Sequence, residues 1–289
     1  MAYFLHILIL INIYIIIAIS LNLIAGYTGI LSIAHAAFYG VGAYVAALLA
    51  VNYGTPFLLN LIAAMIVAGA VAAVVAFPSL RIHDDYLVIA TFGFQMILFS
   101  IFNNWVSLTR GPLGIPGIPQ PKIFGMAIAS HVGFLILTGL LVLAVYLFAR
   151  RLVNSPFGRV LKAIREDEIF AQALGKNVIR YKILVFVIGG ALAAIAGTLY
   201  AHYVTFIDPT SFTILESIFM ISIVLVGGAG SLTGSIVGAV VLIVIPEMLR
   251  FLGMPNAIAA NMRQIIYGAL LVVMMMFRPK GLVGEYELR

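Results

Sequence analysis

The chain has 289 residues, of which 64% are hydrophobic and only 9% are charged, and its formal net charge is +6. A soluble domain is about half apolar and about a quarter charged, so this composition excludes an ordinary soluble fold. A bilayer core about 30 Å thick is crossed by about 20 helical residues, and backbone groups inside it find no water. The long apolar runs therefore predict an all-α, polytopic transmembrane helical bundle, with residues 1–289 forming a single domain.

Nine apolar segments are predicted as membrane spans, and the expected count is eight to ten. The seventh and ninth are short, so we expect tilted, broken or re-entrant helices there. The first segment is too long for a signal-peptide core and lacks a basic leader, which favours a permanent span. The nine segments are residues 3–25, 31–51, 57–77, 86–108, 124–149, 183–201, 213–226, 236–252 and 264–277.

Glycine-rich breaks precede the second and the eighth of these spans. The first break is Gly26-Tyr27-Thr28-Gly29 and the second is Gly227-Gly228-Ala229-Gly230. Small residues let membrane helices approach closely, and broken helices are tolerated where they line a cavity or are buried in protein. Two interpretations stay open: packing faces joined by tight turns, or broken helices beside a transport pathway.

The basic residues predict the orientation of the chain in the membrane. Eight of the 16 lie in residues 150–182, the one long polar segment. The positive-inside rule places this segment in the cytoplasm, together with the turn at residues 81–85 and the tail carrying Arg278 and Lys280. We therefore expect a multi-pass membrane protein, with the N-terminus outside and the C-terminus in the cytoplasm. This distribution is typical of a topology signal, so no nucleic-acid partner is expected.

The polar segment is predicted to contain two short helices. Ser155 is a candidate N-cap with Pro156 in the first turn, and Gly175 is a candidate helix end. The apolar faces before and after residues 165–168 are out of phase, so we expect the two helices to meet there at an angle. A simple connection needs only a few residues. A surface helix on anionic lipid and a docking element for a cytoplasmic partner are both possible, and the acidic Glu166-Asp167-Glu168 favours the partner.

The carboxylates of the chain bear on ion coupling, which usually needs an acidic group deep in the membrane. We expect Glu216 to form a capping box with Thr213, and Glu247 to form an interfacial pair with Arg250. Asp208 is expected in an external loop. The sequence contains no G-x-x-x-x-G-K-[ST] motif for ATP binding. Neither ion coupling nor ATP hydrolysis by this chain itself is therefore expected.

No catalytic residue, metal or cofactor is expected. The chain has no cysteine, and of its five histidines only His83 has carboxylates beside it, in what we interpret as an ordinary charged turn. Hydrogen bonding between helices is the expected role of the polar residues at membrane depth. Three of them, Ser32, His35 and Gln95, are also candidates for lining a translocation pathway. The full set is Asn12, Asn22, Ser32, His35, Thr91, Gln95, Asn103 and Asn104.

Several motifs together make the chain similar to a known family. Residues 158–175, followed by Asn177-Val178, resemble the cytoplasmic loop of ABC importer permeases of the branched-chain amino acid type, in particular the M-type subunits of leucine/isoleucine/valine importers. Asp84 departs from the pattern, since Gly is expected before Asp-Tyr. The other matching stretches are GILSIAHAAF (29–38), DYLVIAT (85–91), GGAGSL (227–232) and FRPKGL (277–282).

The resemblance implies a complex of this chain with a paralogous H-type permease subunit, two ABC ATPases and a periplasmic binding protein, set in the membrane lipid of the bacterial inner membrane. It also implies that residues 165–175, within a cytoplasmic coupling segment at residues 150–182, contact the ATPase and transmit its motion. Branched-chain amino acids are the implied substrates, although the same permease type also serves urea, short amides and other amino acids. An ion-coupled transporter and a membrane enzyme are less favoured. The candidate coupling residues are Arg159, Arg165, Glu166, Asp167, Glu168, Ile169, Phe170, Ala171, Leu174 and Gly175.

Overall fold

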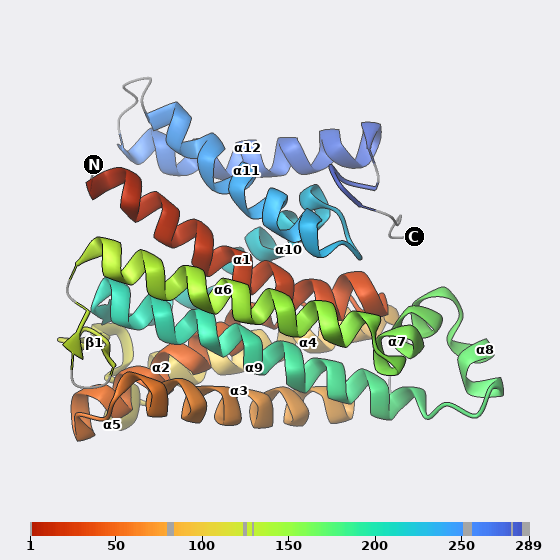
Figure 1. Ribbon diagram of the computed structural model, residues 1–289, viewed down its shortest axis with the longest axis horizontal. Coiled ribbons are helices and arrows are strands. Elements are labelled where there is room, and N and C mark those ends of the chain that lie inside the picture. Colours follow the sequence, from red (N-terminus) through yellow and green to blue (C-terminus); the bar gives the residue numbers. More distant parts are fainter. Residues whose placement is uncertain are drawn as a thin grey trace.

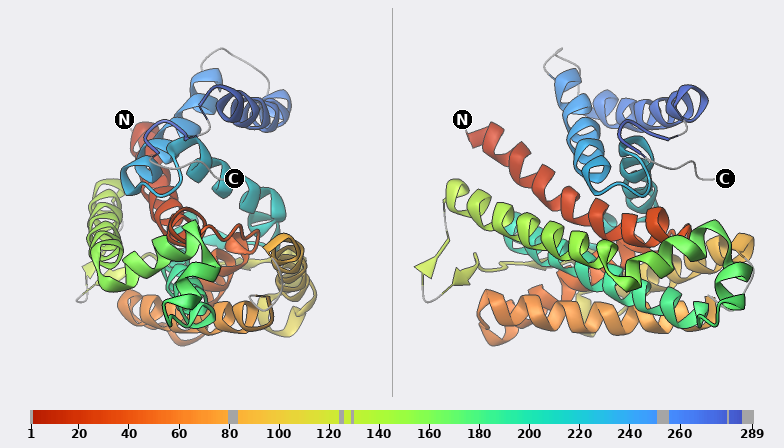
Figure 2. Two further views of the ribbon diagram at one scale, coloured as in Figure 1. Left: turned by 90° about the vertical axis from the view of Figure 1, so that its right-hand side faces the viewer. Right: turned by 45° about the vertical axis from the view of Figure 1, so that its right-hand side comes forward.

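The computed structural model describes residues 2–79, 84–123, 126–128, 130–250, 256–278 and 280–284. Most of the long helices lie side by side in a bundle, with α10, α11 and α12 along one side (Figure 1; Figure 2). These helices are α1 (Ala2–Thr28), α2 (His35–Tyr53), α3 (Phe57–Ser79), α4 (Asp84–Asn104), α6 (His131–Asn154), α9 (Val178–Val204), α10 (Ile214–Gly227), α11 (Leu232–Arg250) and α12 (Asn256–Phe277).

Short elements occupy the two ends of the bundle. At one end, β1 (Ile115–Pro116) pairs antiparallel with β4 (Phe206–Ile207), and β2 (Lys122–Ile123) pairs with β3 (Met126–Ala127). The opposite end carries α7 (Pro156–Glu166) and α8 (Glu168–Ala173), which project beyond the long helices (Figure 1). The remaining short helices are α5 (Val106–Thr109), η1 (Gly111–Leu113) and η2 (Pro209–Phe212).

The described helices confirm the predicted polytopic helical bundle. Six of them, α1, α2, α3, α4, α6 and α9, are long and apolar enough to cross a membrane. Helices α10 and α11 make a seventh span if they are taken together, and they are bent by 119° at the break between them. Each of the nine predicted segments overlaps a helix, but the count of nine spans stays a prediction. The charged turn proposed around His83 lies outside the described residues, as do the side chains of Asp84 and Asp85.

The core forms where α9 packs against α1, α2 and α3. The backbones of α2 and α9 meet directly at glycine: a Cβ on Gly42 would lie 2.4 Å from the Cα of Ala194, and one on Gly197 would lie 2.1 Å from the Tyr39 carbonyl oxygen. Lipid tails are as apolar as helix surfaces, so close packing of small residues is what holds such helices together. The small residues of the second span therefore serve packing.

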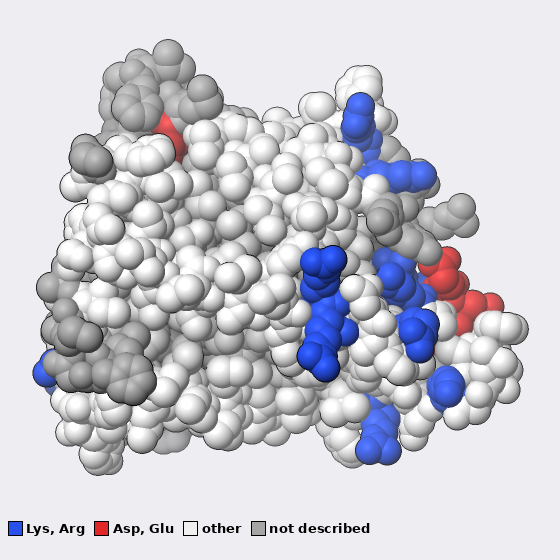
Figure 3. Space-filling model, in the orientation of Figure 1, with Lys and Arg blue, Asp and Glu red and all other residues white. Residues whose placement is uncertain are grey.

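Charge is confined mainly to one end of the molecule. On the face shown in Figure 3, most Lys and Arg side chains lie in the half of the molecule that ends in α7 and α8, and the other half is almost uncharged. This separation is expected of a protein whose central band lies in lipid and whose charged end lies in water.

Replacing Gly197 by alanine should destabilise the bundle by about 1–3 kcal/mol, because the new methyl group would collide with the backbone of α2. The matched control is Gly93→Ala in α4, where a Cβ meets no atom within 4 Å. Thermal unfolding in detergent should show a lower midpoint for Gly197→Ala and an equal or higher one for Gly93→Ala. Equal midpoints for the two variants would contradict the close α2–α9 contact.

Candidate functional site

Residues 155–175, the central part of the predicted coupling segment 150–182 and called the coupling segment below, contain the two short helices that the sequence predicts. Ser155 caps α7 by accepting a hydrogen bond from the Gly158 amide at 3.4 Å, and Asp167 caps α8 by accepting one from the Phe170 amide at 2.9 Å. Helix α8 ends at Ala173, and Gly175 follows with a φ of +75°, a conformation that glycine adopts without strain. The break between the two helices falls at Asp167, whose backbone is extended, and so lies within the predicted residues 165–168.

Three of the ten candidate coupling residues attach this segment to the body of the protein. The Glu168 carboxylate lies 2.5 Å from the ammonium of Lys182, whose side chain is only 6% exposed. Ala171 is buried in a small cluster with Ile164 and Val178. Arg165 is likewise almost buried, with its side chain 8% exposed. Sequence reasoning missed Lys182, which lies one helix away and shares no local pattern with Glu168.

Three large apolar side chains project from α8 and the residue after it into the surroundings. Ile169 is 79% exposed, and Phe170 and Leu174 are each 60% exposed. They lie at the charged end of the molecule, away from the apolar band of the bundle (Figure 1; Figure 3). An apolar patch among charged residues at such a position is typical of a protein-binding surface. The other exposed candidates are Arg159, Glu166, Asp167 and Gly175.

Arg165 joins the coupling segment to both glycine-rich breaks. Its Nη1 donates a hydrogen bond to the Gly26 carbonyl oxygen near the end of α1. A Cβ built on Gly29 would lie 3.1 Å from the Arg165 Cγ, and one on Gly230 would lie 2.7 Å from Nη1. A Cβ at Gly230 would therefore overlap the guanidinium, and one at Gly29 would crowd the aliphatic part of the Arg165 side chain. Its positive charge also faces the C-terminal, negative end of the α1 dipole.

Asn22 ties the second break to α1. Its Nδ2 donates to the Ser231 carbonyl oxygen at 2.8 Å and to the Ser235 Oγ at 2.7 Å, and its Oδ1 accepts from the Gly230 amide at 2.9 Å. The two breaks, about 200 positions apart in the chain, thus meet at one place. Asn22 confirms the expected hydrogen bonding between helices.

The three candidate pathway residues lie in or against the break before α2. Ser32, His35 and Gln95 are all fully buried. The Gln95 Oε1 accepts from the Ala37 amide at 2.8 Å, and its Nε2 donates to the Phe212 carbonyl oxygen at 2.9 Å. The His35 Nε2 lies 2.7 Å from the Ser20 Oγ. These contacts join α2 to α1, α4 and η2, and the role of the three residues in a pathway stays a prediction.

The predicted capping box at the start of α10 is wrong. Thr213 is the N-cap but its side chain makes no capping hydrogen bond, and the Glu216 carboxylate instead accepts a hydrogen bond of 2.6 Å from the Tyr14 hydroxyl. Tyr14 lies near the middle of α1, so a carboxylate does lie within the helical bundle. A hydrogen bond between two residues 202 positions apart in the sequence, on α1 and α10, thus takes the place of the local capping box. Glu247 accepts a hydrogen bond from Tyr3, and the Arg250 side chain proposed as its partner lies outside the described residues.

Comparison with known proteins places the chain among transport permeases. Residues 3–275 match the family described as a branched-chain amino acid transport system permease component. The high-affinity branched-chain amino acid permease protein LivM of Salmonella typhimurium is 37% identical over 94% of this chain and 68% of its own length. The probable LivM of Methanocaldococcus jannaschii is 30% identical over 79% and 68%, and LivH of Escherichia coli is 29% identical over 95% and 92%. No solved structure matches this chain.

Replacing Glu168 by glutamine should loosen α8, because it removes the carboxylate charge that faces the nearly buried Lys182. We expect amide hydrogen exchange in residues 168–173 to accelerate about tenfold, which corresponds to about 1.4 kcal/mol of local stability. Glu166→Gln is the matched control, since that side chain is mostly exposed and lies 3.7 Å from Arg165. Mass spectrometry of the exchanged peptides separates the two, and equal exchange in both variants would contradict the anchoring role.

Proposed function

We propose, on the premise that this chain belongs to the family of permease components of branched-chain amino acid transport systems, that it is the membrane-spanning subunit of an ATP-driven amino acid importer. The energy would come from separate ATPase subunits. Both M-type and H-type relatives match the chain, which supports a working permease built from two paralogous subunits. A periplasmic binding protein would deliver the substrate.

The observation that carries this proposal is the apolar tip of the coupling segment. Ile169, Phe170 and Leu174 project from a short helix that is anchored to the body by the Glu168–Lys182 ion pair. A rigid element with an exposed apolar tip suits a groove on a cytoplasmic ATPase, because buried apolar anchors supply most of the binding energy of an interface. This assignment puts α7 and α8 in the cytoplasm, the N-terminus outside and the C-terminus inside.

Arg165 offers a route from the ATPase to the membrane. It lies at the last turn of α7, touches the end of α1 through Gly26, and packs against the α10–α11 turn at Gly230. A displacement of α7 would therefore move both glycine-rich breaks together. Ser32, His35 and Gln95 are fully buried, so they would line a pathway only after the break before α2 has moved.

An ion-coupled carrier is the second candidate function, and Glu216 favours it. A carboxylate within a membrane bundle is a candidate site for proton or cation coupling. Its hydrogen bond to Tyr14 also has a structural explanation, since the pair links α1 to α10. The family and the coupling segment support ATP-driven import over this alternative, with branched-chain amino acids ahead of urea, short amides or other amino acids as substrates.

The double variant Ile169→Ser/Phe170→Ser should recover at least about tenfold less ATPase in co-purification, because it removes two apolar anchors of the interface. The control is Val106→Ser/Leu113→Ser, which changes two equally exposed apolar residues at the opposite end of the bundle. Unchanged ATPase recovery with the α8 variant, at normal membrane insertion, would refute the docking role.

Uptake of leucine by vesicles that contain the assembled transporter and its binding protein should require ATP. It should persist when ionophores collapse the proton and sodium gradients, because ATP hydrolysis and not an ion gradient supplies the energy for transport. Glu216→Gln should leave the ATP requirement in place. Uptake that follows an ion gradient without ATP, and that is lost in Glu216→Gln, would favour the ion-coupled carrier.

A further inference from the structure

A polar pocket lies at the charged end of the molecule, between the end of α6 and the turn that joins α10 to α11. Its volume is about 210 Å³, several times that of a water molecule. Four elements of the fold contribute to it: the last turns of α1, the end of α6, helix α7 and the start of α11. The lining residues are Tyr27, Arg150, Val153, Asn154, Lys162, Gly230, Ser231, Leu232 and Thr233.

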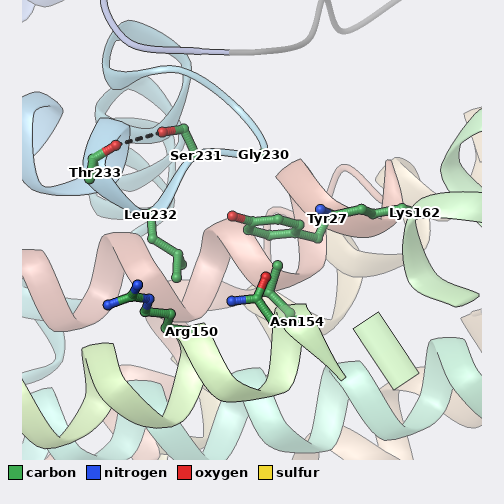
Figure 4. A pocket seen from close by; sticks show the side chains of 9 residues that line it. Tyr27, Arg150, Asn154, Lys162, Gly230, Ser231, Leu232 and Thr233 are labelled. Carbon is green, nitrogen blue, oxygen red and sulfur yellow. Dashed lines mark hydrogen bonds between the residues drawn. The ribbon is translucent and has the colours of Figure 1, made fainter. Parts of the chain in front are cut away.

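The pocket has a strongly positive lining. Arg150 and Lys162 come from two different helices, and no lining residue is acidic. Within the described part of the chain, neither cation pairs with a carboxylate; Lys162 lies over the Tyr27 ring, 5.7 Å from its centre. In Figure 4 the two cations lie at opposite sides of the pocket, and the Asn154 amide and the Tyr27 hydroxyl lie between them. Cations and neutral donors in this arrangement suit an anion with several oxygen atoms.

The start of α11 adds to the positive potential. This helix begins at Leu232 with Ser231 as its cap, since the Ser231 Oγ accepts a hydrogen bond from the Gly234 amide at 3.1 Å. Ser231 and Thr233 are joined through their hydroxyl oxygens at 2.9 Å, as Figure 4 shows. The positive end of a helix dipole favours a nearby anion, so it reinforces the two side-chain cations.

The surface next to the pocket indicates where the anion comes from. Leu140, Leu143 and Leu147 are exposed on α6 at the spacing of one helix face, and this face leads to Arg150, also exposed. An apolar stripe that ends at a cation matches the layout of a phospholipid, whose acyl chains lie beside its headgroup. Basic pockets between helices at the cytoplasmic boundary are suited to anionic headgroups.

We propose that this pocket binds the phosphate of an anionic membrane phospholipid, with the acyl chains lying along the exposed face of α6. Arg150 and Lys162 hold the phosphate from two sides, and Asn154 donates a hydrogen bond to it. Because Lys162 belongs to α7, the bound lipid links the coupling helix to α6 and to the α10–α11 turn. The lipid site does not depend on the identity of the transported substrate.

The full chain in neutral detergent should bind phosphatidylglycerol more tightly than phosphatidylcholine in native mass spectrometry. We expect Arg150→Gln/Lys162→Gln to weaken phosphatidylglycerol binding about twenty-five-fold, at about fivefold for each cation removed. Arg151→Gln/Arg180→Gln is the matched control, because it removes two exposed cations that do not line the pocket. Arg150→Lys/Lys162→Arg keeps both positive charges and should bind phosphatidylglycerol as the parent does. This result would show that changing these two positions does not by itself unfold the pocket.

Four results would overturn the proposal. Equal losses in the pocket variant and the control would reduce the effect to general surface charge, and equal binding of the two lipids would remove the need for an anion. Inorganic phosphate that displaces the lipid at equal concentration would make the ligand a soluble anion. A pocket variant that keeps its lipid affinity but loses ATPase recovery would instead identify a contact with an acidic protein partner.

Discussion

A backbone amide or carbonyl at the end of a helix needs another partner when it is buried away from water, and the buried backbone groups at the two breaks of this bundle meet that constraint. The amides of Ala36 and Ala37, in the first turn of α2, are taken by Ser217 and Gln95. The Gly230 amide is taken by Asn22, and the Gly26 carbonyl by Arg165. Each partner side chain comes from another helix. The hydrogen bonds to these backbone groups therefore also determine how α1, α4, α7, α10 and α11 pack.

This arrangement links the projecting segment α7–α8 mechanically to the membrane-spanning helices. Arg165 satisfies a backbone group of one break and fills the space beside the glycine of the other, so α7 cannot shift without disturbing both. The Glu168–Lys182 pair holds α8 to the start of α9, which keeps the exposed tip at Ile169 and Phe170 from moving independently. A force applied to Ile169 and Phe170 on α8 would therefore reach the two breaks through α7 and Arg165.

Helix α7 also takes part in the proposed phospholipid pocket. Lys162, three residues before Arg165, lines the proposed phospholipid pocket, which also contains Gly230 of the second break. In the proposed assembly, the same short helix would contact the ATPase-binding element α8 on one side and membrane lipid on another. Glu216 lies away from the charged end. There its hydrogen bond with Tyr14 links α10 to α1. The charged end and the interior carboxylate are separate features of the molecule.

Composition and periodicity were sufficient to predict the helical bundle, the two-helix coupling segment and the caps at Ser155 and Gly175, because these depend on neighbours within a few residues. The motifs were sufficient to predict the family. Only the tertiary structure decided that Arg165 reaches both breaks, that Lys182 anchors Glu168, and that Glu216 bonds Tyr14 in place of a capping box. The physical reason is that a hydrogen bond or ion pair between distant helices leaves no periodic trace in the sequence, whereas in the membrane interior it is strong enough to override a local preference.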